Sequence, residues 1–340
     1  MKVLICDYPE RMMPDHSLEV ETLREGLGDD LKVVVHPYDD SERGEFLELL
    51  SDADALLTAF VPMDEEAFAH APNLKVVAIN ATGYDNVDLE AATRHGVGVC
   101  PVGEYCTWDV SESAIAYMFA LNKHLKFYTR QIEDEHVWDF AAAPEYPRMQ
   151  DQMLGIVGFG KIGKCTARKA SGLVKRVIAY DPYVADEEFE RLGVERVTDR
   201  DELFASADII VSHMCLTDSN RFFFNAEAFS KMRRSPILIN LGRGLAVDEG
   251  ALVKALDDGT IRAFGADVLY DETPDLANHP LVGRDNVIIT PHSAFYSTAS
   301  MRDVQVVPCK NIVHFINGER DQLFKLVNDV PVGVGACELA

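Results

Sequence analysis

The stretch MLGIVGFGKIG, Met153–Gly163, decides the fold, because an apolar run leads directly into three spaced glycines. The run is short and rich in β-forming residues, which predicts a buried strand of a parallel sheet. Gly158, Gly160 and Gly163 follow the G-x-G-x-x-G spacing: the first allows a tight turn, the second a close approach of backbone to pyrophosphate, and the third close helix packing. The free N–H groups of the next helix favour phosphate. We therefore predict a dinucleotide-binding turn.

The residue after the second strand supports this prediction and indicates which dinucleotide binds. The apolar run Arg176–Tyr180 ends at Asp181, close to the position about 20 residues on where an acid bonds the adenosine ribose. A carboxylate there also repels a 2′-phosphate, so NAD is favoured over NADP. The alternative is a glycine turn in an ordinary α/β protein, but strand, glycines, helix and acid occur together here.

Composition limits the class of protein. The 340 residues suffice for two domains, and the net charge of −24 disfavours contact with nucleic acid or anionic lipid. The chain begins with a strand, Lys2–Cys6, rather than a signal peptide, and no apolar run is long enough to span a membrane. We therefore expect a cytoplasmic protein with no membrane partner and no nucleic-acid partner.

The acidic residues are spread along the chain rather than gathered in a tail. The simple interpretation is solubility, and the sharper hypothesis is adaptation to high salt, which screens the self-repulsion. Full stability in dilute buffer would contradict the second interpretation. Seven scattered cysteines contain no C-x-x-C pair, so we predict neither a metal site nor a disulfide framework.

Strands alternate with helices through most of the chain, which predicts an α/β fold with parallel sheets. Before the glycine turn, strand-like runs occur at Lys2–Cys6, Leu31–Val35, Ala55–Thr58, Leu74–Ile79 and Gly96–Cys100. From the turn onward they occur at 153–157, 176–180, 207–212, 236–240, 263–268 and 286–290, predicting a six-stranded doubly wound sheet. A last helix near 297–316 contains Pro308 and is expected to return to the first domain. The predicted domains are 1–103 plus 297–340, and 104–296.

Three charged or titratable residues follow strands of the second domain: Arg243, Glu272 and His292. The carboxyl edge of such a sheet is where ligands bind. Reduction of a 2-keto acid needs a carboxylate clamp, a proton donor and a hydride. Arg243 offers a planar fork, His292 exchanges protons near neutral pH, and Glu272 beside the imidazole would orient it and favour its charged form.

Each residue has a simpler interpretation. Arg243 could form a surface ion pair, His292 after a proline could be structural, and Glu272 could be a solvated loop acid. Their joint occurrence behind a dinucleotide motif favours the chemical interpretation.

Five motifs together give the chain a specific resemblance over nearly its full length. They are Gly83–Asp88, the Gly158 motif with Asp181, Asn240–Gly244, Asp267-Val268 with Glu272, and Pro291-His292. In their order and spacing the chain resembles the D-2-hydroxyacid dehydrogenase family, most closely its D-lactate dehydrogenase-like and C-terminal-binding-protein-like branches.

The resemblance implies a fold, a site and partners. It implies two Rossmann-like domains: a central NAD-binding domain with a doubly wound sheet, and a smaller flavodoxin-like substrate domain built from both termini. It implies the catalytic set Arg243, Glu272 and His292, and a homodimer through the cofactor domains. The implied NAD-binding residues are Gly158, Gly160, Lys161, Ile162, Gly163, Asp181, His213, Leu241, Gly242 and Asp267, with Asp267 holding the nicotinamide amide.

The implied substrate residues are Thr82, Gly83, Tyr84, Tyr105 and Phe295, with the N–H groups of Thr82 and Gly83 facing the substrate carboxylate. Glu272 stands where the formate dehydrogenase branch is expected to have Gln, which argues against formate. Phe295 and Tyr105 resemble the D-lactate branch. Asn80 replaces a basic residue of lactate enzymes, which puts a strict lactate assignment in doubt.

We therefore expect an NAD-dependent D-2-hydroxyacid dehydrogenase that reduces small 2-keto acids, with pyruvate first and hydroxypyruvate or glyoxylate next. Two alternatives stay open. One is an NAD(H)-sensing corepressor-like dimer with little catalysis, although those proteins are expected to have Trp at the position of Phe295. The other is an enzyme for an inorganic acid such as phosphite, which would want more positive charge in 80–88.

Overall fold

The computed structural model describes residues 1–271 and 273–333. The chain forms two compact units: the split unit, Met1–Tyr105 with Ser297–Ala340, and the central unit, Cys106–Tyr296. The first boundary lies two residues beyond the one expected from sequence, so that Tyr105 ends the split unit. No helix among the described residues is long and apolar enough to cross a membrane.

The split unit is built on a five-stranded parallel sheet in the order β2-β1-β3-β4-β5. This is the flavodoxin-like order, as expected. Its strands are β1 (Lys2–Asp7), β2 (Lys32–Pro37), β3 (Ala55–Thr58), β4 (Val76–Ile79) and β5 (Gly98–Pro101). Strands β1, β3, β4 and β5 are buried along their whole length, which explains why they are apolar without alternation.

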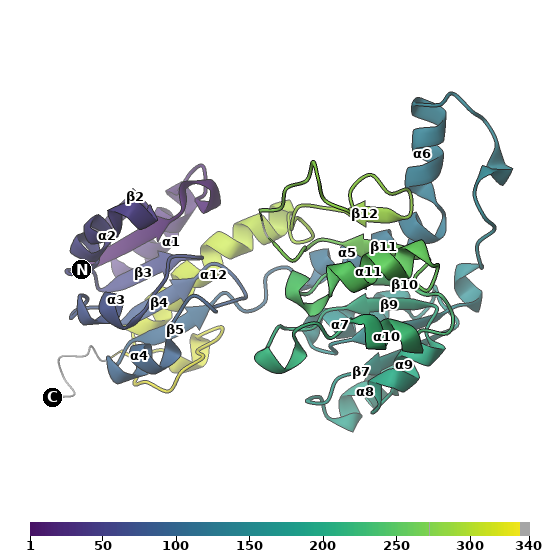
Figure 1. Cartoon of the computed structure of the whole chain (residues 1–340). Helices are drawn as coiled ribbons and strands as arrows, with labels where there is room; N and C mark the ends of the chain where they lie inside the picture. Colours follow the sequence, from purple (N-terminus) through teal and green to yellow (C-terminus); the bar gives the residue numbers. More distant parts are fainter. Residues whose placement is uncertain (272, 334–340) are drawn as a thin grey trace. The chain divides into compact units, whose positions relative to one another are not determined.

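Helices cover both faces of this sheet (Figure 1). On one face α1 (Ser17–Leu27) packs against α12 (Thr298–Ile316), and on the other lie α2 (Arg43–Leu50), α3 (Glu65–Ala69) and α4 (Leu89–Arg94). Helix α12 approaches β5 so closely that a Cβ on Gly98 would lie 2.1 Å from the Phe315 ring. The C-terminal helix therefore completes the core of the split unit.

The central unit contains a seven-stranded parallel sheet in the order β12-β11-β10-β9-β6-β7-β8. Its strands are β6 (Met153–Val157), β7 (Arg176–Tyr180), β8 (Glu195–Arg196), β9 (Ile209–Ser212), β10 (Ile237–Asn240), β11 (Ala263–Ala266) and β12 (Val287–Ile289). The prediction of six strands was wrong by one, because β8 has two residues, both charged, and carries no apolar signal. The order reverses between β6 and β9, where ligands bind in such sheets.

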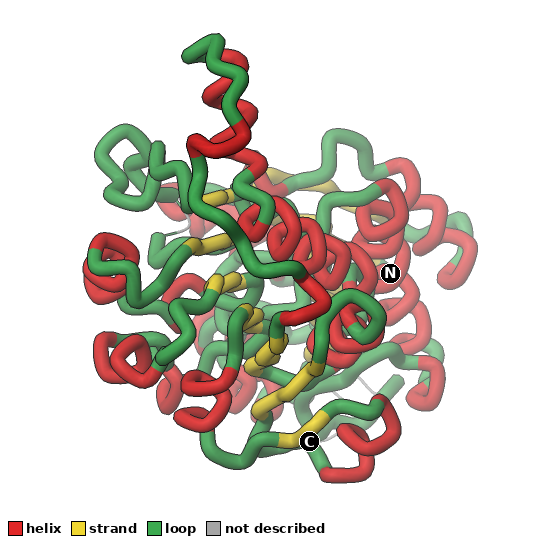
Figure 2. The backbone as a smooth tube through the Cα atoms, turned by 90° about the vertical axis from the view of Figure 1, so that its right-hand side faces the viewer, coloured by secondary structure: helices red, strands yellow, loops and turns green. Residues whose placement is uncertain are grey.

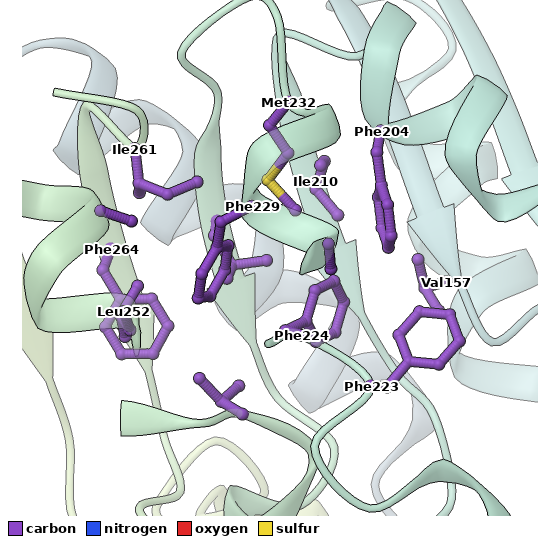
Figure 3. Packing of buried hydrophobic residues seen from close by; sticks show 14 of the residues in the cluster. Val157, Phe204, Ile210, Phe223, Phe224, Phe229, Met232, Leu252, Ile261 and Phe264 are labelled. Atoms are coloured by element: carbon purple, nitrogen blue, oxygen red, sulfur yellow. The ribbon is translucent and has the colours of Figure 1, made fainter. Parts of the chain in front are cut away.

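Helices also cover both faces of the central sheet. Helices α5 (Thr107–Asn122) and α7 (Lys161–Ala170) pack together, while α9 (Arg200–Ser206), α10 (Ala226–Lys231) and α11 (Glu249–Asp257) cover the opposite face. Asp199, Asn225 and Asp248 cap the last three by accepting backbone N–H bonds. Figure 3 shows the aromatic core beneath them, with Phe204, Phe224 and Phe264 among its members. Helix α8 (Asp186–Leu192) follows β7.

One part of the central unit projects from its sheet, as both Figure 1 and Figure 2 show. This arm consists of α6 (Leu125–Glu133) and the loop that follows it to residue 148. The Arg130 guanidinium forms two 2.8 Å bonds to the Asp285 carboxylate, and Lys126 Nζ donates to two main-chain carbonyl groups, those of Arg284 and Val287. The base of the arm is therefore fixed to the sheet.

Candidate active site

Two of the three glycines in the turn after β6 are required sterically. Gly158 has a φ of +88°, and a Cβ there would lie 2.8 Å from the backbone of His213 after β9. A Cβ on Gly163 would lie 2.2 Å from the carbonyl oxygen of Gly158, so this glycine lets α7 pack against the turn. Gly160 differs, because its Cβ would meet no heavy atom within 4 Å. The turn therefore has open space beside Gly160, where the dinucleotide motif places a pyrophosphate.

The first prediction concerns this open space. In the Gly160→Ala variant the added methyl group strains nothing, since φ is −71° and no neighbour is close. We expect an unchanged melting temperature and NADH binding weakened by about tenfold, which corresponds to about 1.4 kcal/mol. Fluorescence titration with NADH measures the loss. Gly172→Ala is the matched control, because its Cβ also meets nothing within 4 Å; unchanged NADH affinity in Gly160→Ala would contradict the assignment.

Asp181 lies beside the glycine turn. The sequence predicts that its carboxylate binds the adenosine ribose of the cofactor. Its Oδ2 accepts the N–H of Phe159 at 2.8 Å, and its Oδ1 accepts that of Tyr183 at 2.9 Å. Each oxygen keeps a second lone pair for a ribose hydroxyl. Lys161 and Ile162 form the first turn of α7, next to Gly160. The turn, Asp181 and the helix start thus fit the adenosine and pyrophosphate parts of NAD.

His213 follows β9, and its side chain is not a positively charged group that could bind phosphate. Its Nε2 lies 2.8 Å from Thr166 Oγ1 in α7, and its Nδ1 is buried and has no hydrogen-bond partner among the described residues. Burial lowers the pKa of His213 to about 3. The imidazole is therefore neutral at physiological pH and borders the glycine turn as an uncharged group.

Arg243 lies three residues beyond β10, in a loop that Asn240 organises. The Asn240 side chain accepts the N–H of Gly242 at 3.2 Å and donates to the carbonyl of Arg243 at 2.9 Å. The half-buried guanidinium donates to the Gly242 carbonyl at 3.0 Å, and no described carboxylate forms an ion pair with it.

The same loop also contacts the loop after β9. A Cβ on Gly242 would lie 2.5 Å from the carbonyl of Met214, and the Leu241 N–H donates to the carbonyl of Ser212. The neighbouring loops after β9 and β10 are thus in direct contact.

His292 lies in the loop after β12, and Asp267, the residue after the neighbouring strand β11, holds that loop. The two carboxylate oxygens of Asp267 accept the N–H groups of Ser293 and Ala294, each at 2.8 Å, and the Thr290 hydroxyl donates to Oδ1 as well. The N–H of His292 donates to the carbonyl of Asp267 at 2.8 Å. His292 has a φ of +51°, a costly conformation for a non-glycine residue, which the surrounding bonds maintain.

The structure therefore brings Arg243, Asp267 and His292 to the carboxyl ends of three adjacent strands, β10, β11 and β12. Phe295 follows in the same loop, its ring edge-on to the His292 ring at 6.3 Å. Glu272, predicted as the third catalytic residue, lies outside the described residues. This edge offers a cationic fork and a proton-exchanging imidazole beside a dinucleotide turn.

Sequence reasoning missed Asn240 and Tyr117 as site residues. The Tyr117 hydroxyl, from α5, lies 2.6 Å from the Thr290 hydroxyl and donates to the carbonyl of Ala266 at 3.0 Å. Burial, with the Asp267 carboxylate nearby, raises the pKa of Tyr117 to about 12, so the hydroxyl stays protonated. Asn240 could have been recognised, because a polar Asn at the end of an apolar strand often organises the following loop. No feature of the sequence indicates that Tyr117 lies near β11.

Thr82, Gly83, Tyr84 and Tyr105 belong to the split unit. The loop after β4 carries the first three and ends at Asp88, whose side chain caps α4 by accepting the N–H of Ala91 at 2.9 Å. The Lys325 ammonium lies 5.3 Å from the centre of the Tyr84 ring. Within the described chain, neither the N–H of Thr82 nor that of Gly83 donates a hydrogen bond. Tyr105 is half-buried at the end of the unit.

Known proteins resemble the chain in sequence and in structure. Residues 115–294 match the family model of the D-isomer specific 2-hydroxyacid dehydrogenase NAD binding domain. A glyoxylate reductase of Korarchaeum cryptofilum is 34% identical over 80% of this chain and 82% of that protein. A hydroxypyruvate reductase of Blautia hydrogenotrophica is 32% identical over 81% of this chain and 85% of that protein. The D-lactate dehydrogenase of Aquifex aeolicus, solved with NAD and lactic acid, is 27% identical with a TM-score of 0.80, covering 96% of this chain and 99% of that one.

A doubly wound sheet with a dinucleotide turn, flanked by an arginine and a histidine at its carboxyl edge, defines an NAD-dependent oxidoreductase. The chain belongs to the D-isomer-specific 2-hydroxyacid dehydrogenase family, whose members act on 2-hydroxy acids. The family, the α/β fold and the NAD cofactor expected from sequence are thereby confirmed.

Proposed function

We propose that this enzyme reduces small 2-keto acids to 2-hydroxy acids, of D configuration where the product is chiral, with glyoxylate and hydroxypyruvate ahead of pyruvate. The observation that supports the reaction is the placement of Arg243, Asp267 and His292 just after the neighbouring strands β10, β11 and β12, with Asp267 holding the His292 loop. The order of substrates follows the relatives above 30% identity, which include glyoxylate and hydroxypyruvate reductases. It reverses the order that the sequence favoured, in which pyruvate came first.

In the proposed mechanism, each of four side chains acts on the substrate, on the cofactor or on another of the four. The Arg243 fork binds the substrate carboxylate and polarises the keto oxygen. The His292 imidazolium donates a ring N–H proton to that oxygen, and Glu272 holds the ring in its charged form. NADH supplies the hydride when bound. Asp267 fixes the His292 loop and is also proposed to accept a bond from the nicotinamide amide.

The remaining substrate residues are proposed from their local chemistry. The undonated N–H groups of Thr82 and Gly83 suit a carboxylate, and Tyr84 and Tyr105 would border the same ligand. Phe295 would form an apolar wall that limits the length of the substrate side chain. His213, Leu241 and Gly242 would line the cofactor without contributing charge.

The test is NADH oxidation with glyoxylate, hydroxypyruvate, pyruvate and phenylpyruvate, at low and high KCl and with NADPH in parallel. We expect turnover with NADH and the highest kcat/KM for glyoxylate or hydroxypyruvate. A clear preference for phenylpyruvate would contradict the small-substrate proposal. Tight NADH binding with no turnover under any condition would favour the nucleotide-sensing alternative.

We also propose that the enzyme is a homodimer joined through the arm. Trp138 and Phe140 are 89% and 91% exposed, and Leu125, Ile132 and Val137 are exposed beside them. Apolar side chains this exposed on a firmly anchored element are typical of a protein interface, and a second copy presents the same arm.

In the dimer prediction, Trp138→Ser combined with Phe140→Ser converts the dimer to a monomer at micromolar concentration, because the apolar burial is lost. Light scattering after size-exclusion chromatography measures the mass, and the unfolding curve checks the fold. Val282→Ser, at an exposed valine elsewhere in the unit, is the control. A monomeric wild type, or a dimeric double variant, would contradict the proposal.

We propose a cytoplasmic location because the described cysteine thiols are not paired in disulfides. The described cysteines are free, and Cys6, Cys100, Cys106, Cys165 and Cys309 are buried, which suits a reducing compartment. Recovery of the native protein in a secreted fraction would contradict this location.

A further inference from the structure

Tyr270 lies four residues beyond β11, at the start of the segment 270–279 that contains Glu272. Its backbone N–H donates a 2.8 Å hydrogen bond to Oε1 of Glu249, the first residue of α11. The backbone just before Tyr270 packs closely against Gly244, next to Arg243, because a Cβ on Gly244 would lie 1.6 Å from the carbonyl oxygen of Leu269. The start of the segment is therefore fixed against the loop that carries Arg243.

The same glutamate also reaches the far end of the segment. Glu249 Oε2 lies 3.3 Å from Nε2 of His279, and the two side chains are only 20% and 11% exposed. One carboxylate thus ties Tyr270 and His279, nine positions apart, to the first turn of a helix. A partly buried bond of this kind is shielded from water more than a surface ion pair is.

An aromatic contact with Phe222, a residue of strained backbone, also holds Tyr270 in place. The Phe222 ring stacks on the Tyr270 ring at 6.3 Å between centres and 6° between planes. Phe222 has a φ of +53°, and its N–H donates to the carbonyl of Leu245 at 2.9 Å. Backbone strain of this kind persists where the surroundings fix it and is concentrated near functional sites. Tyr270 is thus contacted by the start of α11, by the loop that carries Arg243 and by the Phe222 ring.

We propose that Glu249 is a positioning residue for catalysis: by tying Tyr270 and His279, it holds both ends of the Glu272 segment and the backbone beside Arg243. The inference rests on the proposed function, in which Arg243 and Glu272 act on the substrate. Glu249 is not among the residues proposed above to contact substrate or cofactor. No described residue other than Glu249 bonds both Tyr270 and His279.

The test is steady-state kinetics of Glu249→Ala over a range of pH. We expect kcat to fall by about 10- to 100-fold, the cost of a slightly misplaced catalytic group, with NADH affinity unchanged. The pH at which reduction loses half its rate should move to lower pH, because Glu272, in the role proposed above, would then stabilise the charged proton donor less. A residue with a merely structural role would lower the melting temperature without moving this pH.

Two further variants keep the inference testable if Glu249→Ala does not fold. Glu249→Gln retains an acceptor for the Tyr270 N–H and should restore most of kcat, whereas His279→Gln should shift the pH profile in the same direction as Glu249→Ala. Asp257→Ala, at the other end of α11 and paired with Arg284, is the matched control and should change nothing. An unshifted pH profile in both Glu249→Ala and His279→Gln would overturn the inference. An inactive wild type would instead refute the proposed function.

Discussion

We expect the His292→Gln variant to lose about 10²- to 10⁴-fold in kcat for keto-acid reduction, the usual contribution of a positioned general acid. The loop should keep its shape, because Asp267 binds it through the main-chain N–H groups of Ser293 and Ala294 rather than through the imidazole. NADH binding should therefore stay close to the wild-type value. Stopped-flow measurement of NADH oxidation, with a separate binding titration, distinguishes the two effects.

His70→Gln is the control for this variant, since His70 is an exposed histidine in the split unit. Its kinetics should equal those of the wild type. A His292→Gln enzyme that keeps its full rate would remove His292 from the mechanism.

The second large effect is expected at Arg243. Arg243→Lys keeps the positive charge but loses the planar fork, so we expect kcat/KM to fall by about 10²-fold, in line with the loss of one or two charge-assisted hydrogen bonds. The loop backbone should persist, because Asn240 bonds the main chain of Gly242 and Arg243. A rise in KM for the keto acid with unchanged NADH affinity is the expected pattern.

Arg233→Lys provides the comparison, because Arg233 is exposed before β10 at the opposite end of the same strand. It should leave kcat/KM unchanged. If Arg243→Lys also retained the wild-type KM, another cation would have to bind the carboxylate.

Local signals in the sequence account for most of the fold. Buried parallel strands such as β1, β6 and β10 form continuous apolar runs, and the spacing of the glycines identifies the turn after β6. The short charged strand β8 has neither signal. The return of α12 to the split unit was expected because the central sheet is complete at Thr290, and its contact with Gly98 explains why it packs there.

The site was less predictable, because its organisation depends on bonds between distant residues. Arg243 and His292 were predicted from strand ends and motif order, and the structure places both at the carboxyl edge of the central sheet. Asp267 was predicted to hold the nicotinamide amide, which stays a prediction, and its bonds to the His292 loop were not foreseen. Tyr117, Asn240 and the Glu249 tie to Tyr270 and His279 depend on tertiary contacts that no local pattern encodes.

The central claim is that this chain catalyses NADH-dependent reduction with D stereochemistry. The most direct measurement is chiral analysis of the 2-hydroxy acid formed from hydroxypyruvate, with NADH consumption followed in the same reaction. The account predicts the D isomer in one-to-one ratio with NADH oxidised. Formation of the L isomer, or NADH binding without any product, would contradict it.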